Sequence, residues 1–383
     1  MDGETSSSLR VSVEGNNSYS CAVTGYEDYR SPPVYGPKLP SVSVSPSAEI
    51  VEGNSVTLTC SSDANPAANY TWYKENEDNP LSEGPQLVFS SIQSSDSGQY
   101  FCTAENMLGR RTSRSISIDV KYGPKLTSVS VSPSAEIVEG SSVTLTCSSD
   151  ANPAANYTWY KENVYNPLSE GPQLVFSSIQ SSDSGQYTCR ARNSLGPNTS
   201  KPISIKVKYA PKLPSTSVSP SGEIEEGSSV TLTCHSNAYP AANYTWYKKN
   251  GNPELQPLSE NTPLVFRSIQ SSDSGEYYCT AENELGRRTS RSISIDVKYG
   301  PKITSVSVSP SGEIMEGSSV TLNCSSDANP AANYTWYKEN EDSPKASGQI
   351  FTITDVRPEH SGNYYCEAQN SRGRQNSTLH LIV

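Results

Sequence analysis

Cysteine is the residue type in this chain best suited to chemistry, and its spacing is regular. Cysteines that recur in pairs roughly 42 to 45 residues apart can form disulfide bonds, whereas zinc needs closely spaced Cys or His ligands. No Cys-x-x-Cys motif occurs, and His235, His360 and His380 are scattered. We therefore expect four structural disulfides, made in an oxidising compartment, and no metal site. The pairs are Cys60 with Cys102, Cys147 with Cys189, Cys234 with Cys279, and Cys324 with Cys366.

The ninth cysteine, Cys21, falls outside this pairing. It stands two residues after Tyr19, as Cys102 stands two residues after Tyr100, so it occupies the second cysteine position of an incomplete copy. Its natural partner would lie in an early strand that the chain lacks. We expect Cys21 to be unpaired; the alternative is a reactive thiol or a bond to another chain.

Acceptor sequences for N-linked glycans are dense, and one of them recurs. Asn-Tyr-Thr-Trp stands at the same place in four copies, where Tyr and Trp face inward and alternation turns the asparagine outward. We expect glycans at Asn69, Asn156, Asn243 and Asn333, and further ones at Asn198 and Asn376. Asn16 also begins an acceptor sequence. Asn323 adjoins the disulfide cysteine Cys324 and is not expected to be modified.

The other polar residues give no support for catalysis. No histidine recurs at a fixed distance from a serine, no Gly-x-Ser-x-Gly motif occurs, and no EF-hand loop is present. Carboxylates such as Glu75, Glu77 and Asp78 are typical of solvated loops. We expect a non-enzymatic protein without a cofactor. Arginine pairs such as Arg110-Arg111 could contact an anionic partner or stay solvated.

The composition indicates an all-β extracellular protein. Only 33% of residues are hydrophobic, and 24 glycines and 27 prolines punctuate the chain at intervals. The net charge of −11 disfavours binding to nucleic acid. No stretch approaches the roughly 20 apolar residues that cross a bilayer, and the first residues lack the pattern of a secretory signal. We expect the ectodomain of a plasma-membrane protein or a secreted fragment, hence a piece of a larger protein.

The cysteine pairs divide the chain into repeats. Successive first cysteines lie 87, 87 and 90 residues apart. We expect residues 1–35 to be the C-terminal remnant of one domain, followed by four complete domains at 36–122, 123–209, 210–299 and 300–383, called repeats 1 to 4 below. The junctions are short: the segment 120–126 leads from the last strand of one repeat almost directly into the next. Such linkers predict beads on a rod.

Alternation within a repeat gives the strands. The segment Val56-Thr57-Leu58-Thr59-Cys60 places Val, Leu and Cys on one face, and Tyr70 and Trp72 face inward in the next strand. We expect two sheets of seven to eight strands in total, closed over a tryptophan that packs on the disulfide. The predicted core contains Trp72, Trp159, Trp246 and Trp336, with Tyr100, Tyr187, Tyr277 and Tyr364.

The tyrosine two residues before each second cysteine predicts a tyrosine corner, in which the hydroxyl bonds to backbone upstream. Asp96 is expected to accept hydrogen bonds that close the same turn. Repeat 4 has His360 at this position, which predicts a looser corner or a different partner.

Two cysteines that bracket a tryptophan, with this tyrosine, are the mark of an immunoglobulin sandwich. The roughly 42 residues between the cysteines leave no room for the central strands of a variable-type domain. We therefore predict tandem immunoglobulin-like sandwiches of the short constant-like kind (C2 or I type).

Over essentially all of residues 1–383, the repeats resemble the constant-like domains of the sialic-acid-binding immunoglobulin-like lectins (siglecs), particularly the fish forms of their B-cell inhibitory receptor. The motifs that carry the resemblance are Gly53 to Cys60, Asn65-Pro66, Tyr70 to Lys74, Asp96 to Tyr100, Ala104-Glu105-Asn106 and Tyr122-Gly123-Pro124-Lys125. In that family an arginine on a variable-type first domain binds sialic acid. The chain contains no complete variable-type domain, so the resemblance implies sialoglycan binding only through a domain that is absent here.

Two functions follow as hypotheses. The first is the stalk of a siglec-like B-cell receptor, which presents the lectin domain in cell adhesion and inhibitory signalling. The alternative is a homophilic adhesion protein or a soluble decoy. Both imply protein or glycoprotein ligands on cell surfaces.

Overall fold

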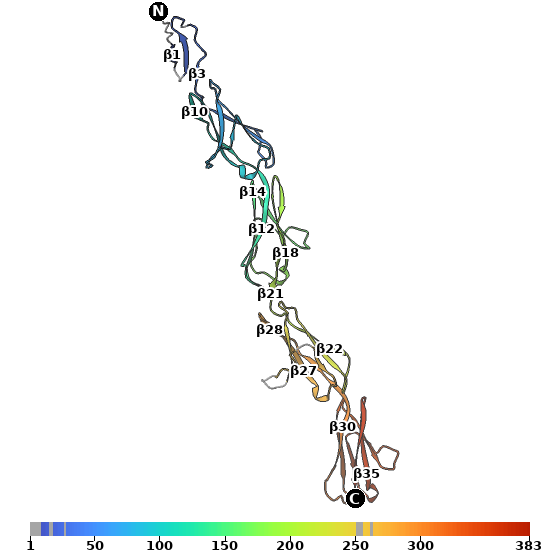
Figure 1. Ribbon diagram of the computed structural model, residues 1–383. Coiled ribbons are helices and arrows are strands. Elements are labelled where there is room, and N and C mark those ends of the chain that lie inside the picture. Colours follow the sequence, from blue (N-terminus) through green and yellow to red (C-terminus); the bar gives the residue numbers. More distant parts are fainter. Residues whose placement is uncertain (1–8, 15–17, 27, 250–255, 261–262) are drawn as a thin grey trace, which may run out of the picture. The chain divides into compact units, whose positions relative to one another are not determined.

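The computed structural model describes residues 9–14, 18–26, 28–249, 256–260 and 263–383, which belong to two units, Met1–Lys206 and Val207–Val383 (Figure 1). Asn16 lies outside the described residues. Residues before repeat 1 form one antiparallel sheet of three strands in sequence order. These strands are β1 (Leu9–Glu14), β2 (Ser18–Val23) and β3 (Val34–Tyr35).

Repeat 1 is a sandwich of two antiparallel sheets. One sheet has the order β4-β5-β8, and the other has the order β10-β9-β6-β7 with β11 also paired to β9. We call the first the ABE sheet and the second the CFG sheet, and use these names for the equivalent sheets of the other repeats. The elements are β4 (Ser41–Ser45), β5 (Val56–Ser61), β6 (Asn69–Lys74), β7 (Ser82–Glu83), β8 (Gln86–Phe89), the 3-10 turn η1 (Ser94–Asp96), β9 (Gly98–Asn106), β10 (Gly109–Thr112) and β11 (Ile116–Ile118).

Repeats 2 to 4 follow this order, with differences in their short strands and edge strands. In repeat 2 they are β12 (Tyr122–Ser132), β13 (Ile137–Val138), β14 (Val143–Asn152), β15 (Asn156–Lys161), β16 (Ser169–Glu170), β17 (Gln173–Phe176), η2 (Ser181–Asp183), β18 (Gly185–Asn193), β19 (Gly196–Thr199), β20 (Ile203–Ile205) and β21 (Val207–Lys208). In repeat 3 they are β22 (Ser215–Ser219), β23 (Ile224–Glu225), β24 (Val230–His235), β25 (Asn243–Lys248), β26 (Leu264–Phe266), η3 (Ser271–Asp273), β27 (Gly275–Asn283), β28 (Gly286–Thr289) and β29 (Ile293–Ile295). The last set is β30 (Val297–Ser309), β31 (Val320–Asn329), β32 (Asn333–Lys338), β33 (Ala346–Ser347), β34 (Ile350–Ile353), η4 (Pro358–His360), β35 (Gly362–Asn370) and β36 (Gly373–Leu381).

The core of each sandwich lies where the inward faces of the two sheets meet. In β5, Val56, Leu58 and Cys60 are buried while the threonines between them are not fully covered, as period-two alternation requires. Trp72 stands directly opposite Cys102 in the CFG sheet, so the indole packs next to the disulfide. All four tryptophans, Trp72, Trp159, Trp246 and Trp336, are 0% exposed.

Four disulfides join the two sheets, one in each repeat: Cys60–Cys102, Cys147–Cys189, Cys234–Cys279 and Cys324–Cys366. Each closes a loop of 42 to 45 residues, which stabilises the fold by roughly 4 kcal/mol in the chain-entropy account. For a net domain stability of about 5–10 kcal/mol, this is a large share.

The tyrosine corner forms as expected. The Tyr100 hydroxyl donates to the Asp96 carbonyl at 2.6 Å, and the Asp96 carboxylate accepts from the Gln93 backbone N–H at 2.8 Å. Burial raises the pKa of Tyr100 to about 12, because a phenolate there would be poorly solvated. In repeat 4 the corner is looser: His360 Nδ1 replaces the carboxylate as acceptor, and the Tyr364 bond lengthens to 3.0 Å.

The predicted fold class is confirmed: the chain is all-β and consists of tandem immunoglobulin sandwiches. Within the described residues, no helix has the length and apolar character needed to span a membrane.

Candidate functional site

The predicted glycan acceptors lie on the outer face of the CFG sheet. Asn69 is the exposed first residue of β6 and stands opposite Glu105. The equivalent residues Asn156, Asn243 and Asn333 are also exposed and stand opposite Arg192, Glu282 and Gln369. Each acceptor side chain thus points into solvent, where a glycan has room.

The two further predicted acceptors differ in their placement. Asn376 of β36 is exposed and stands opposite Glu367, which also stands opposite Thr335 in β32. Because residues in register share a face, Asn376 and Asn333 lie on the same face of repeat 4. Asn198 lies in the edge strand β19 and stands opposite the buried Ala191. Its side chain therefore lies on the inward side of that strand, and the residue is half-buried.

Aromatic and charged side chains cover the rest of the CFG face. In repeat 1 the rings of Tyr73 and Phe101 stack at 5.4 Å, and Arg110 donates to the Tyr73 hydroxyl at 3.1 Å and to Thr103. Arg110 also lies 3.9 Å from Glu105. Repeat 3 builds the same cluster from Tyr247, Tyr278, Arg287 and Thr280. The arginine that the sequence offered as an anion contact is therefore engaged within its own sheet.

A second set of polar contacts joins consecutive repeats within each unit. Lys125, within the junction, donates from Nζ to Glu52 Oε1 of repeat 1 at 2.6 Å and to Ser94 Oγ at 3.3 Å. Glu52 Oε1 also accepts from the Ser94 backbone N–H at 3.0 Å. The bond from Lys125 holds the pKa of Glu52 below its ordinary value. Lys125 further lies over the ring of Tyr122, 4.7 Å from its centroid.

An amide and a carboxylate complete this joint. Asn152 of repeat 2 donates to Asp119 Oδ1 at 2.6 Å and to the Val120 carbonyl at 2.9 Å. Lys121 donates to Asp119 Oδ2 at 2.6 Å, and together with Asn152 it lowers the pKa of Asp119. Glu52 belongs to the repeat before the junction and Asn152 to the repeat after it. Their contacts therefore restrain rotation of one repeat relative to the other.

The joint between repeats 3 and 4 has the same construction. Lys302 donates to Glu226 Oε1 at 2.5 Å and to Ser271 Oγ at 3.0 Å, and its ammonium lies 4.6 Å from the centre of the Tyr299 ring. Asn329 donates to Asp296 at 2.6 Å and to the Val297 carbonyl at 2.8 Å. Here Arg372 adds ion pairs to Glu223 and Glu225.

Strand continuity accompanies these two joints. β12 and β30 begin inside the junction and run on into the ABE sheet, with register shifts at Lys125 and Lys302. Thr127 and Thr304 stand in these strands where Pro40 and Pro214 stand in the other junctions. Proline has no N–H to donate, and there the first strand starts only at Ser41 and Ser215.

Sequence reasoning did not identify the joint residues, although a signal was present. The Asp119, Lys125 and Asn152 types recur as Asp296, Lys302 and Asn329. Between repeats 2 and 3, Lys206 and Tyr239 stand at the positions of Asp119 and Asn152. Comparison of the junctions with each other, rather than of whole repeats, would have distinguished the junctions that carry both Asp and Asn from the junction between repeats 2 and 3, which does not.

The remaining candidates stay apart from one another. Cys21 is half-buried and makes no disulfide, and its backbone N–H donates to Ser31 Oγ at 2.9 Å. Among the described residues, no group of three or more His, Cys, Asp or Glu side chains could hold a metal ion.

Comparison with known proteins gives the same kind of domain for all four repeats. The family described as "Immunoglobulin domain" matches residues 39–120, 123–207 and 300–383, and a second family with the same description matches residues 214–283. The chain is 34% identical over 347 residues to the mouse B-cell receptor CD22, a siglec, covering 88% of this chain and 39% of the relative. Mouse hemicentin-1 is 29% identical over 362 residues, covering 87% of this chain and 6% of the relative.

The chain therefore spans less than half the length of these relatives. Among solved structures, the N-terminal four immunoglobulin domains of Dscam1 isoform 1.9 align with 91% of this chain and 99% of that one, at 20% identity and a TM-score of 0.31. The expected siglec resemblance is confirmed by the likeness to CD22, and the relatives are consistent with an extracellular adhesion or receptor-like role. Its four Cys–Trp–Tyr–Cys sandwiches and these matches show that the chain belongs to the immunoglobulin superfamily.

Proposed function

We propose that this chain is the stalk of a siglec-like cell-surface receptor of B cells. It would carry a variable-type lectin domain away from the membrane, in adhesion and inhibitory signalling. The likeness to CD22 supports this assignment, and the chain corresponds to a minor part of that relative's length. The variable-type domain would bind the sialoglycan, and these repeats would set the distance of that domain from the membrane.

The observation that carries the proposal is the pair of joints centred on Lys125 and Lys302. A stalk must hold consecutive domains in a fixed relation, and each joint does so with a lysine, a carboxylate and an amide contributed by both repeats. Partly covered ion pairs backed by further hydrogen bonds stabilise more than isolated surface pairs, which contribute about 0–1 kcal/mol each.

The proposal includes the finer predictions from the sequence. Its domain limits are 36–122, 123–209, 210–299 and 300–383, after a remnant at 1–35. The protein is non-enzymatic and extracellular, since four disulfides require an oxidising compartment. Glycans occupy the CFG faces, starting with Asn69 and its equivalents. Its partners are proteins or glycoproteins on cell surfaces, without nucleic acid.

The test is sialoglycan binding by this chain alone and by the same chain behind a siglec variable-type domain. The chain, secreted from eukaryotic cells and applied to a glycan array, should bind no sialoside. The fusion should bind sialosides, and sialidase treatment of the array should abolish this binding. Sialidase-sensitive binding by the chain alone would contradict a pure stalk.

The second candidate, a homophilic adhesion protein or decoy, is favoured by a different observation. In repeat 1, the outward residues of the ABE strands include no charged side chain, whereas exposed carboxylates such as Glu83 and Glu105 lie in the CFG sheet. Because interface cores are depleted of charged residues, such a face suits a contact between copies.

A further inference from the structure

A hollow of about 680 Å³ lies along the β16 edge of the CFG sheet in repeat 2, and its volume falls in the range of about 300–1,000 Å³ that is typical of small-molecule sites. Its walls come from two short segments, residues 155–158 around the start of β15 and residues 170–172 between β16 and β17. Asn156, the predicted glycan acceptor of this repeat, is itself part of the wall. The hollow therefore begins at the atom to which a glycan would be attached.

The backbone leaves this space open at Gly171. Its φ is 108°, a left-handed conformation that favours glycine, and apart from its chain neighbours no heavy atom lies within 4 Å of the place that a Cβ would take. The Gly171 N–H donates to the Tyr157 carbonyl at 2.9 Å, and the Gly171 carbonyl accepts from Trp159 Nε1 at 3.2 Å. Both backbone polar groups of Gly171 are thus paired while one side of the residue stays open.

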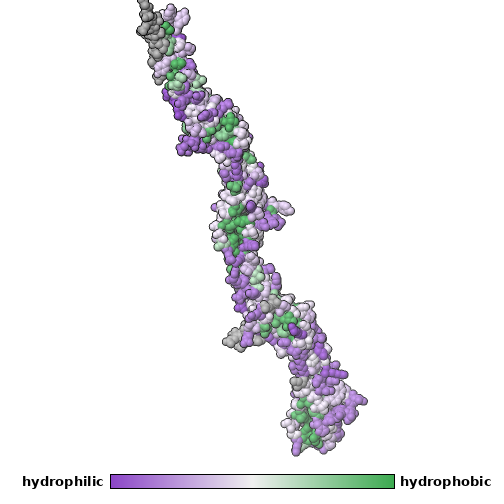
Figure 2. All heavy atoms as spheres, viewed as in Figure 1, coloured by the Kyte–Doolittle hydropathy of each residue, from purple (hydrophilic) through white to green (hydrophobic). Residues whose placement is uncertain are grey.

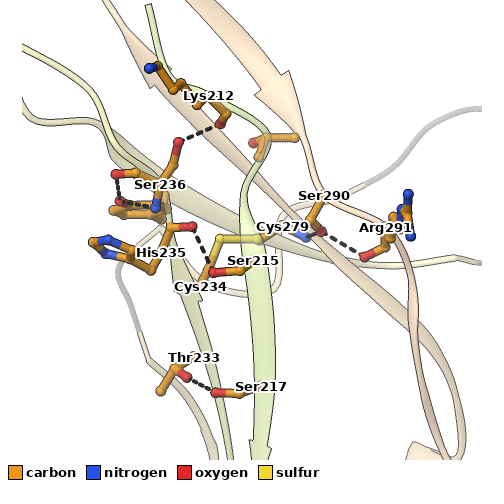
Figure 3. The surroundings of a disulfide bond; sticks show 12 residues. Lys212, Ser215, Ser217, Thr233, Cys234, His235, Ser236, Cys279, Ser290 and Arg291 are labelled. Atoms are coloured by element: carbon orange, nitrogen blue, oxygen red, sulfur yellow. Dashed lines mark hydrogen bonds between the residues drawn. A yellow bond between two sulfur atoms is a disulfide. The ribbon is translucent and has the colours of Figure 1, made fainter. Parts of the chain in front are cut away.

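Two of the side chains that line the hollow point away from the core. Trp159 stands opposite Cys189 and faces the disulfide, so alternation turns Thr158 and Asn156 outwards. Figure 3 shows the equivalent bond of repeat 3, Cys234–Cys279, in the space between its two sheets. Asn156 and Thr158 therefore line the hollow from the outer face of the sheet.

The walls combine apolar and polar groups, as a sugar ring does. Ala155 and Pro172 offer aliphatic contacts, Thr158 offers a hydroxyl, and Glu170, which stands opposite Thr158, offers an exposed carboxylate. A carboxylate accepts hydrogen bonds, so it suits the hydroxyl and amide N–H groups of an N-acetylated sugar. In the view of Figure 2, hydrophobic residues form small patches among hydrophilic ones. A ligand with both kinds of group fits such a surface better than a purely apolar one.

We infer that the innermost sugar of the Asn156 glycan, an N-acetylglucosamine, binds in this hollow and stabilises the β16 edge of the sheet. The sugar is bonded directly to the Asn156 side-chain nitrogen, so its entry into the hollow is intramolecular and costs little freedom of motion. β16 has only two residues and pairs with β15 at the edge of the sheet, so a covering sugar shields an edge held by few hydrogen bonds. The inference rests on the glycans of the proposed function and gives one of them a structural role.

Repeat 1 has the same residue types at these positions, whereas repeat 4 differs. Residues 68–71 and 83–85 repeat the types of 155–158 and 170–172, Thr71 stands opposite Glu83, and Gly84 has a φ of 110°. In repeat 4, Ser347 and Gln349 replace the glutamate and the proline. The sugar at Asn69 should therefore bind in the same way, and the sugar at Asn333 should bind more weakly because the charged acceptor is missing.

The experiment is hydrogen exchange of the full chain, secreted with high-mannose glycans, in three forms. The first keeps its glycans, the second is trimmed with endoglycosidase H to one N-acetylglucosamine per site, and the third is Asn156→Gln, which carries no sugar there. Exchange in peptides that contain Gly171 should be equal in the first two forms. It should be about two- to tenfold faster in the third, which is the effect of losing about one net hydrogen bond.

A double-mutant cycle separates sugar binding from a direct effect on the strand. Glu170→Ala should accelerate the same exchange about two- to tenfold in the glycosylated chain and should add nothing in the Asn156→Gln background. Glu162→Ala is the matched control, because it removes another exposed carboxylate of repeat 2 outside the hollow, and it should change neither.

Equal exchange with and without the sugar would overturn the inference, as would additive effects of Glu170→Ala and Asn156→Gln. Either result, on a chain whose Asn156 carries a glycan, would leave the proposed function standing. An unmodified Asn156 in the secreted chain, detected by mass spectrometry, would overturn both this inference and the glycan of the proposed function. The stalk role itself fails on a separate result, sialoside binding by the chain alone.

Discussion

The tyrosine corner of repeat 2 offers a stability prediction whose size follows from the structure. Tyr187 is 1% exposed, and its hydroxyl donates to the Asp183 carbonyl at 2.6 Å. Tyr187→Phe keeps the packing of the ring and removes this bond. The bond itself contributes about 1 kcal/mol net, and a partly buried carbonyl left without a donor costs more, so we expect a loss of about 1.5–2 kcal/mol. That is roughly a fifth of a typical domain's stability.

Hydrogen exchange resolved by peptide is the suitable assay, because a multidomain chain does not unfold in one step. Amides of β14, β15 and β18 should exchange faster by the factor of about 10–30 that this free energy implies. Amides of β5, β6 and β9 in repeat 1 should not change. Tyr364→Phe in repeat 4 should have a smaller effect, since its bond is 3.0 Å long.

The exposed tyrosine of the same repeat supplies the control. Tyr165 is fully exposed, so Tyr165→Phe should alter the free energy of unfolding by less than about 0.5 kcal/mol. If Tyr187→Phe behaved like Tyr165→Phe, the corner would be a geometric feature without energetic weight. An increase in exchange spread over all repeats would equally refute the reasoning.

Three further predictions concern pH and modification. Burial raises the pKa of Tyr187 from 10.0 to about 12, so the unfolded chain loses this proton first and stability should fall between about pH 10 and 12; Tyr187→Phe should flatten this part of a pH-dependent unfolding curve. At the first joint, Lys125 lowers the pKa of Glu52 below 4.5. The joint's contribution is therefore present above about pH 4.5 and is lost as the pH falls through the lowered pKa. Exchange at the amides of residues 94, 121–123 and 125 should rise on this acidification in the unaltered chain but not in Glu52→Gln. Mass spectrometry after enzymatic deglycosylation should find Asn69, Asn156, Asn243 and Asn333 converted to Asp; unmodified Asn69 and Asn156 in secreted protein would contradict the exposure argument.

Much of the fold could be predicted because its determinants are local or periodic. Trp72, Tyr100 and the two cysteines hold fixed places in strands whose alternation is visible in the sequence. The corner bond spans four residues, so the substitution by His360 was enough to predict a looser turn in repeat 4.

The joints could not be predicted in the same way. Lys125 meets Glu52 across 73 positions, through a strand whose register shifts twice within the junction. Leu126, in that segment, has a positive φ of 50°, which a leucine seldom adopts. Such geometry arises from how two folded repeats meet. The stacking of Tyr73 on Phe101 likewise depends on cross-strand register, which no pattern within one strand reveals.

The measurement closest to the central claim is the distance distribution across the first joint. Spin labels at exposed Glu75→Cys and Glu162→Cys, in a Cys21→Ser background, report the relation of repeats 1 and 2 by pulsed electron resonance. We predict one narrow distance peak, which broadens when Glu52→Gln and Lys125→Met remove the ion pair. A broad distribution in the unaltered joint, or a narrow one that survives both substitutions, would contradict the claim that these residues make the chain a stalk.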